Sequence, residues 1–189
     1  MSTFLEHQNW RYATKKFDAS KIINKEDLNT LKEAIRLSSS SYGLQPYKII
    51  LVENPELRAK IQPAAWGQSQ IVEASHLIVF ANETQIAEQS IDSYVKNIST
   101  TRNVPIDSLN GYSDFMKSKI VTLDKDSKNI WASKQTYLAM GNLLNEILGL
   151  EKLGLNASLI ATLGYRHDED ASQHYKKVRK SNEDLFITL

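Results

Sequence analysis

Three short apolar segments, separated by amphipathic helical patterns, constrain the fold of this chain most strongly. They read YKIILVE (47–53), HLIVFAN (76–82) and ASLIATLGY (157–165), and they are rich in β-branched residues. Short runs of this kind, bounded by Pro, Gly or polar residues, are typical of buried strands. We expect the first to be a central strand of its sheet. A further strand-like segment, DLFITL (184–189), ends the sequence.

Helices are predicted between these strands. The helical patterns cover residues 24–37, 55–65, 83–100 and 126–150. Asn24 is expected to cap the first helix. The longest helix is expected to bury a stripe formed by Ile130, Tyr137, Leu138, Gly141, Leu144 and Leu148. Residues 102–126 are expected to be irregular, as part of an arm or lid. The pattern as a whole predicts an α+β or α/β fold, with helices covering a small sheet.

Composition narrows the class of protein. The 189 residues are 41% hydrophobic, which suits the core of one ordinary domain. The 23 basic and 22 acidic residues nearly cancel, which argues against a nucleic-acid or membrane partner. The chain has no cysteine, so it has no disulfide or thiolate site, and this fits a cytoplasmic location. No apolar run is long enough to cross a bilayer, and the N-terminal residues do not resemble a signal peptide.

Two basic clusters stand out against this neutral background. NWRYATKKF (9–17) contains Arg11 and Lys15, and HYKKVRK (174–180) contains Lys177 and Arg179. Helical spacing would place the first pair on one side, and extended spacing would do so for the second. Together they could bind one phosphate group, since Arg and Lys are the usual phosphate ligands. The alternative is that each of these charges is simply solvated.

Two polar loops are further candidates for a binding site. SSSSYGLQPY (38–47) could present hydroxyl and N–H groups to a phosphate, a ribityl chain or a ring edge. AAWGQSQI (64–71) carries two amides that could pair with a heterocycle. The alternatives are a helix end followed by a turn, and a turn that buries Trp66 in the core.

The usual catalytic motifs are missing. The four histidines lack the spacing of a zinc site, and the chain contains no nucleophile elbow, phosphate loop or dinucleotide fingerprint. An enzyme of this kind would have to take its chemistry from a cofactor.

Five segments in order resemble the flavin-dependent nitroreductase family, and most closely its oxygen-insensitive NAD(P)H-dependent oxidoreductases. They are RYATKKFD, SSSSYGLQPYKIILVEN, WGQSQIVEASHLIVFAN, KQTYLAMGNLL and ATLGYRHDED…KKVRK. The resemblance implies an α+β fold, a mixed sheet sandwiched by helices. It also implies an intertwined homodimer with two FMN molecules at the interface, in which DLFITL is an exchanged C-terminal strand.

The resemblance also implies the FMN-binding residues. Arg11, Lys177 and Arg179 would hold the phosphate, and Lys15 would lie near the flavin N1/O2 edge, where its charge tunes the flavin. The other implied positions are Tyr12, Ala13, Ser39, Ser40, Ser41, Gly43, Gly67 and Gln70. The serines and Gly43 would contact the flavin of the other subunit. No residue is expected to act as a nucleophile, because flavin N5 carries the chemistry, and no metal is expected.

Three departures from the family pattern are visible. Ala13 replaces a serine, which removes one contact worth about 1 kcal/mol. Gly67 stands where asparagine is common. The residues after Leu144 lack a loop that in relatives offers an N–H group near flavin N5. Either the segment is truly deleted, or the sequence as given omits it.

The resemblance therefore predicts one domain over residues 1–189. Its function would be an FMN-dependent oxidoreductase that takes a hydride from NADH or NADPH and reduces a small electron-poor acceptor, such as a nitroaromatic or a quinone, with ping-pong kinetics. The alternative is a non-enzymatic flavin- or anion-binding dimer that has lost the N5 loop.

Overall fold

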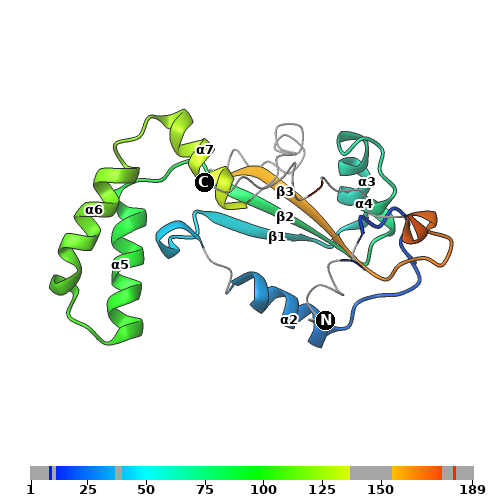
Figure 1. Ribbon diagram of the computed structural model, residues 1–189, viewed down its shortest axis with the longest axis horizontal. Helices are drawn as coiled ribbons and strands as arrows, with labels where there is room; N and C mark the ends of the chain where they lie inside the picture. The colour runs from blue at the N-terminus through cyan, green and yellow to red at the C-terminus, as the bar shows by residue number, and fades with distance from the viewer. Residues whose placement is uncertain (1–8, 10–11, 37–39, 137–154, 176–180, 182–189) are drawn as a thin grey trace.

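The computed structural model describes residues 9, 12–36, 40–136, 155–175 and 181. Its centre is an antiparallel sheet of three described strands, β1 (Tyr47–Val52), β2 (His76–Glu83) and β3 (Leu155–Leu163), in the order β1-β2-β3 (Figure 1). All three predicted strands are confirmed. Among these strands β1 lies at the edge and β2 in the middle, so the central position predicted for 47–53 is not found in the described sheet. The segment 184–189 lies outside the described residues.

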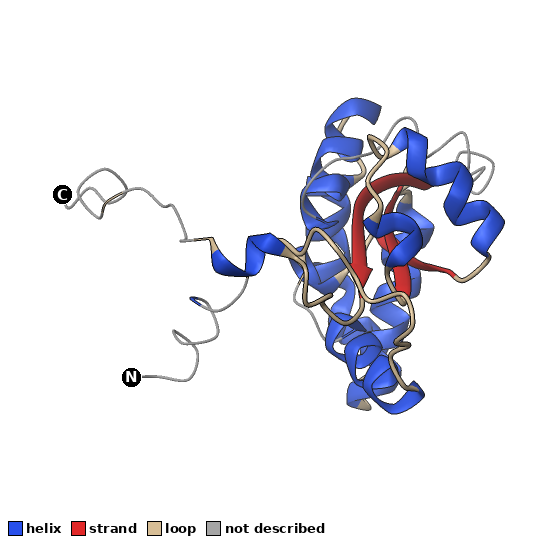
Figure 2. Ribbon diagram, turned by 90° about the vertical axis from the view of Figure 1, so that its right-hand side faces the viewer, coloured by secondary structure: helices blue, strands red, loops and turns tan. Residues whose placement is uncertain are grey.

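The two faces of the sheet are covered by different helices. Alternate residues of β2, Leu77, Val79 and Ala81, are completely buried against Ile61 and Ala65. Ile61 belongs to helix α3 (Pro55–Ala64), which is followed by the short helix α4 (Gln70–Glu73). Helix α2 (Lys25–Arg36) lies on the opposite side of the sheet (Figure 1). Figure 2 shows helices on both sides of the strands, as the α+β prediction requires.

The predicted helix ends are partly confirmed. Asn24 caps α2 as expected, since its Oδ1 accepts the backbone N–H of Asp27 at 2.8 Å. Asn54 caps α3 in the same way through the N–H of Leu57, also at 2.8 Å. Helix α5 (Glu88–Arg102) begins five residues later than predicted, and its C-cap residue Asn103 adopts a left-handed conformation (φ 52°).

The prediction that residues 102–126 are irregular is wrong. They form a short 3-10 helix η2 (Ile106–Leu109), helix α6 (Asn110–Ile120) and the start of helix α7 (Lys125–Thr136). Helices α5 and α6 form a hairpin at one end of the molecule, so the segment does belong to an arm (Figure 1). Ser113, Met116 and Ile120 are buried at three- and four-residue spacing, which stabilises α6 against α5.

Helix α7 uses a different face from the one predicted. Ile130 is 54% exposed, whereas Ala132 and Thr136 are buried. Small side chains at this helical spacing give little hydrophobic signal, which is why the sequence pattern misplaced the stripe. The remaining predicted stripe residues, from Tyr137 to Leu148, lie outside the described residues. Within the described part of the chain, no helix is long and apolar enough to span a membrane.

Candidate functional site

The extended segment 12–18 is attached to helix α4 on one side. Gln70 Nε2 donates a hydrogen bond to the carbonyl of Thr14 (3.4 Å), and the backbone N–H of Phe17 donates to Glu73 Oε2 (3.2 Å). Gln70 and Glu73 are three residues apart on α4, so they lie on the same face of that helix. The structure therefore brings Gln70 next to the first basic segment.

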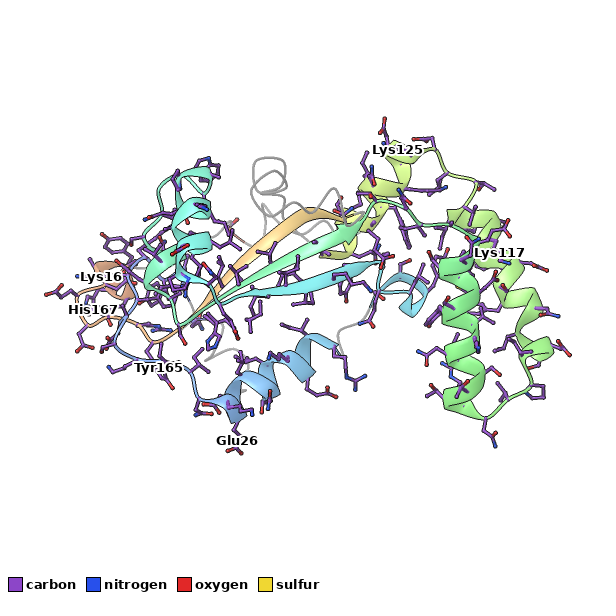
Figure 3. The ribbon with its side chains drawn as sticks, turned by 180° about the vertical axis from the view of Figure 1, so that it is seen from behind. Lys16, Glu26, Lys117, Lys125, Tyr165 and His167 are labelled. Atoms are coloured by element: carbon purple, nitrogen blue, oxygen red, sulfur yellow. The ribbon has the colours of Figure 1, made fainter. Side chains whose placement is uncertain are left out.

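The other side of segment 12–18 is attached to the chain that follows β3. The N–H of Asp18 donates to the carbonyl of Tyr165 (2.8 Å), and the N–H of His167 donates to the carbonyl of Lys16 (3.2 Å). The two hydrogen bonds flank an isolated antiparallel β-bridge between Phe17 and Arg166, which is too short to count as a strand. Lys16 and His167 therefore lie close together at one end of the molecule (Figure 3).

Asp170 is the common hydrogen-bond acceptor of this region. Its Oδ2 accepts the N–H groups of Lys15 (2.9 Å) and Lys16 (3.3 Å) and the hydroxyl of Tyr12 (3.3 Å), while its Oδ1 accepts the N–H and hydroxyl of Ser172. The residue is only 3% exposed. Burial alone would raise the pKa of this carboxyl, but the hydrogen bonds outweigh burial and lower the pKa to about 2. Asp170 is therefore a buried carboxylate at neutral pH.

The two lysines of the segment differ in their partners. Lys16 Nζ pairs with Glu169 at 2.5 Å, and this hydrogen bond raises the pKa of Lys16. The guanidinium of Arg166 lies 4.4 Å from the centre of the Tyr12 ring. No ion pair joins the exposed Lys15 ammonium group to a carboxylate of the described residues. Lys15 is therefore the cation of this segment that is available to an anionic ligand.

The loop before α4 leaves its backbone accessible. Gly67 has a left-handed conformation (φ 67°), and a Cβ built there would meet no atom within 4 Å. Its neighbour Trp66 is 78% exposed, so the alternative that Trp66 anchors the core is wrong. Gln70, by contrast, is buried. A planar ring could approach Gly67 closely because no side chain stands in the way.

The serine loop lies elsewhere. Ser40 precedes the turn η1 (Ser41–Gly43), where the N–H of Ser41 donates to Gln135 Oε1 at 2.8 Å. Gly43 (φ 77°) packs so closely against helix α5 that a Cβ would lie 2.4 Å from the hydroxyl oxygen of Tyr94. The loop is thus fixed by α5 and α7, with no contribution from segment 12–18.

The two parts of the predicted site lie at opposite ends of the sheet. The serine loop leads into Tyr47, which pairs with Asn82. The basic segment is attached to the chain just beyond Leu163, which pairs with His76 at the other end of β2. A strand of six residues such as β1 spans roughly 20 Å. One chain therefore does not bring Ser40, Ser41 and Gly43 to the Lys15 region.

Four predicted binding residues cannot be placed. Arg11, Ser39, Lys177 and Arg179 lie outside the described residues, as does Leu144 with the segment predicted to be shortened. Tyr12, Ala13 and Lys15 lie in the segment that Gln70 contacts, and Gly67 precedes Gln70 by three residues, whereas Ser40, Ser41 and Gly43 lie in the other region.

A groove of about 660 Å³ borders the serine loop. Helix α2, strand β1 and helix α5 form its walls. Its apolar residues include Ile35, Leu44, Ile49, Leu51 and Ile78, and its charged residues are Lys32, Arg36, Lys48 and Glu83. Ile49 of the edge strand is 37% exposed there. This volume is within the range of ligand pockets, although a groove beside an edge strand also suits a protein partner.

Comparison with known proteins identifies the family. The model of the Nitroreductase family matches residues 9–177, most of the chain. The chain belongs to the nitroreductase family. It is 34% identical over 170 residues to a Bacillus subtilis protein named as a candidate NAD(P)H nitroreductase, YfkO, with 86% of this chain and 76% of the relative covered. It is 29% identical over 209 residues to the major NAD(P)H-flavin oxidoreductase of Aliivibrio fischeri, with 95% of each covered.

Solved structures confirm the nitroreductase-like fold. A crystal structure of a candidate nitroreductase from Exiguobacterium sibiricum, in complex with FMN, superposes with a TM-score of 0.79. It covers all of this chain and 98% of its own, at 16% sequence identity. As a member of this family the chain is an oxidoreductase, as the resemblance predicted.

Sequence reasoning missed the residues that hold this site together. Asp170 was not among the predicted site residues, and it is buried, whereas its neighbours Asp168 and Glu169 are exposed. The signal that could have found it is the Asp-x-Ser spacing to Ser172, which is typical of a side chain that caps a turn. Among the described residues, no cluster of His, Asp and Glu is suited to hold a metal ion.

Proposed function

We propose that this chain is an FMN-dependent NAD(P)H oxidoreductase that reduces nitroaromatics or quinones by ping-pong hydride transfer. The observation that supports it most directly is that segment 12–18, which carries Lys15, is hydrogen-bonded to Gln70, three residues after the open backbone of Gly67. The names of two relatives include NAD(P)H, and a structural neighbour contains FMN. A cytoplasmic location stays a prediction from the cysteine-free sequence.

The residues present fit FMN. Lys15 offers an ammonium group without a competing carboxylate among the described side chains, and Gly67 leaves room for a ring to approach the backbone. The chemistry that bound FMN supplies is hydride acceptance from NAD(P)H and electron delivery to the acceptor. Lys15 would stabilise negative charge at the N1/O2 edge of the ring. Gln70 would orient the pyrimidine edge through its amide.

Lys15 can be tested by removing its charge. We expect Lys15→Gln to weaken FMN binding about 10- to 100-fold, because a hydrogen bond to a charged group is worth about 1.5–3 kcal/mol. FMN affinity is measured by quenching of flavin fluorescence. Lys60→Gln, on the exposed surface of α3, is the matched control and should bind FMN as the wild type does. Equal affinity in Lys15→Gln and wild type would remove Lys15 from the site.

The activity has its own test. FMN-loaded protein is mixed with NADH or NADPH, with and without nitrofurazone, and the loss of reduced nucleotide is followed by absorbance. The proposal expects oxidation that depends on the acceptor, with parallel double-reciprocal plots as ping-pong kinetics require. Absence of acceptor-dependent oxidation in FMN-loaded protein would contradict the activity.

A homodimer is part of the proposal. The serine loop lies at the end of the sheet away from Lys15, so it could contact only the FMN of a second copy. The groove beside β1, which is an edge strand among the described residues, is a surface that such a copy could cover. Small electron-poor acceptors would then bind where the two subunits meet.

Subunit complementation tests this arrangement. Lys15→Gln and the double variant Ser40→Ala/Ser41→Ala are each expected to be weakly active. In a mixed dimer, one site receives both defects and the other site receives neither. Unfolding and refolding the two variants together should therefore restore activity toward about a quarter of the wild-type value, because half of the random dimers carry one intact site. No recovery in proven mixed dimers would show that the loop and Lys15 do not share a site across subunits.

A second function is favoured by one observation. The match to the Aliivibrio fischeri relative extends over 209 residues, more than the 189 of this chain, so the relative contains residues that this chain lacks. A shortened segment after Leu144, which the sequence predicts, would account for such a difference. If that segment is needed to accept the hydride, the chain would bind FMN without turnover. Bound FMN that NADH and NADPH fail to bleach would identify this alternative.

A further inference from the structure

Asp170 is not among the FMN-binding residues proposed above, but its contacts give it a role in the same region. It is a buried carboxylate that accepts five hydrogen bonds. The donors are the hydroxyl of Tyr12, the N–H groups of Lys15 and Lys16, and both the N–H and the hydroxyl of Ser172. The donors from Lys15 and Lys16 are backbone N–H groups, so the ammonium of Lys15 is left for other partners. Asp170 thus fixes the backbone of Lys15 without neutralising its side chain.

The neighbouring charges separate Lys15 from the other cations. Glu169 forms an ion pair with the ammonium group of Lys16, and the guanidinium of Arg166 lies over the ring of Tyr12. Both of these contacts come from the segment 166–170, which ends in Asp170. One short segment therefore binds the neighbouring side chains and holds the backbone, while none of its described carboxylates forms an ion pair with the Lys15 ammonium group.

We propose that Asp170 is a positioning residue for the flavin, which acts through Lys15. This rests on the proposed function, since Lys15 is assigned to the flavin there. By accepting the N–H groups of Lys15 and Lys16, the carboxylate sets the direction of the Lys15 side chain toward the N1/O2 edge. Asparagine offers only one acceptor oxygen at this place, and its amide N–H₂ group would face donors. The backbone of segment 12–17 would lose its fixed position.

The proposal and simple electrostatics predict opposite results. A carboxylate near an anionic cofactor repels it, so removing the charge should tighten FMN binding if Asp170 acts only through its field. If Asp170 acts by positioning Lys15, removing it should weaken binding. We expect Asp170→Asn to bind FMN about tenfold more weakly than the wild type and to lower the midpoint potential of the bound flavin, because Lys15 no longer stabilises the reduced ring.

A double-mutant cycle with Lys15→Gln shows whether Asp170 acts through Lys15. FMN affinity is measured by fluorescence quenching, and midpoint potential by spectroscopic titration, in the wild type, both single variants and the double variant. Asp170→Asn should have no further effect in the Lys15→Gln background. The matched control is Asp168→Asn, an exposed carboxylate two residues away, which should bind FMN as the wild type does.

Three outcomes would overturn the proposal. They are unchanged or tighter FMN binding in Asp170→Asn, an equal effect of Asp170→Asn with and without Lys15, and an equal effect of Asp168→Asn. Should Asp170→Asn fail to fold, Ser172→Ala removes one donor to the same carboxylate and is expected to weaken FMN binding severalfold; wild-type affinity would then count against positioning. A wild type that binds no FMN would instead refute the proposed function, before any variant is compared.

Discussion

Replacing Gly43 with alanine is expected to lower the free energy of unfolding by about 2–4 kcal/mol, because two separate costs add. The residue has a φ of 77°, a backbone conformation that is strained for residues other than glycine. A Cβ would also lie 2.4 Å from the Tyr94 hydroxyl oxygen and 3.3 Å from its ring carbon Cζ. The ring cannot move away freely, because its hydroxyl donates to the carbonyl of Tyr42 at 2.7 Å.

Urea denaturation followed by circular dichroism measures this effect. Gly111→Ala is the matched control, because Gly111 lies in helix α6 and a Cβ there meets no atom within 4 Å. That variant should be unchanged or more stable by up to about 1 kcal/mol. In a Tyr94→Phe background, Gly43→Ala should cost less, because the nearest atom is gone and only the backbone strain and the ring contact remain. A stability of Gly43→Ala equal to wild type would show that the turn can adopt another conformation.

Replacing Arg58 with leucine is expected to cost about 3 kcal/mol. The guanidinium is buried in helix α3 and donates to the carbonyls of Ile71 (2.8 Å), Ser75 (3.4 Å) and Ala74. These carbonyls lie at the end of helix α4 and would be left without a partner, which costs about 1–3 kcal/mol for a buried group. Burial lowers the pKa of Arg58, but an arginine stays charged at every pH of practical interest.

The same urea titration tests Arg58, with Lys60→Met on the exposed side of the same helix as the control. The control should stay within about 0.5 kcal/mol of the wild type. Arg58→Lys should give an intermediate loss, because a point charge cannot reach three carbonyls in the planar geometry of arginine. FMN affinity should fall together with stability, since α4 carries Gln70. An Arg58→Leu variant as stable as the wild type would mean that water replaces the arginine.

The strands and the first helix could be predicted because their signals are local. β-branched runs such as HLIVFAN stiffen an extended backbone, and Asn24 followed by Glu26 and Asp27 is a helix start that needs no distant partner. Helix α6 was missed because its buried face includes the polar Ser113 as well as Met116. This mixture gives no clear helical hydrophobic pattern in the sequence, and the face is buried only by packing against α5.

The sequence by itself determined the three described strands, several of the helices, the family and the kinds of side chain that could bind a flavin. Only the tertiary structure decided which of those side chains meet: it brought Gln70 and Asp170 to the segment that carries Lys15, and it placed Ser41 and Gly43 at the far end of the sheet. The physical reason is the range of the interactions. Helix caps and strand propensity act over a few residues, whereas the pairing of Asp170 with Lys15 joins segments 155 residues apart. No local pattern records a contact that exists only after the sheet has formed.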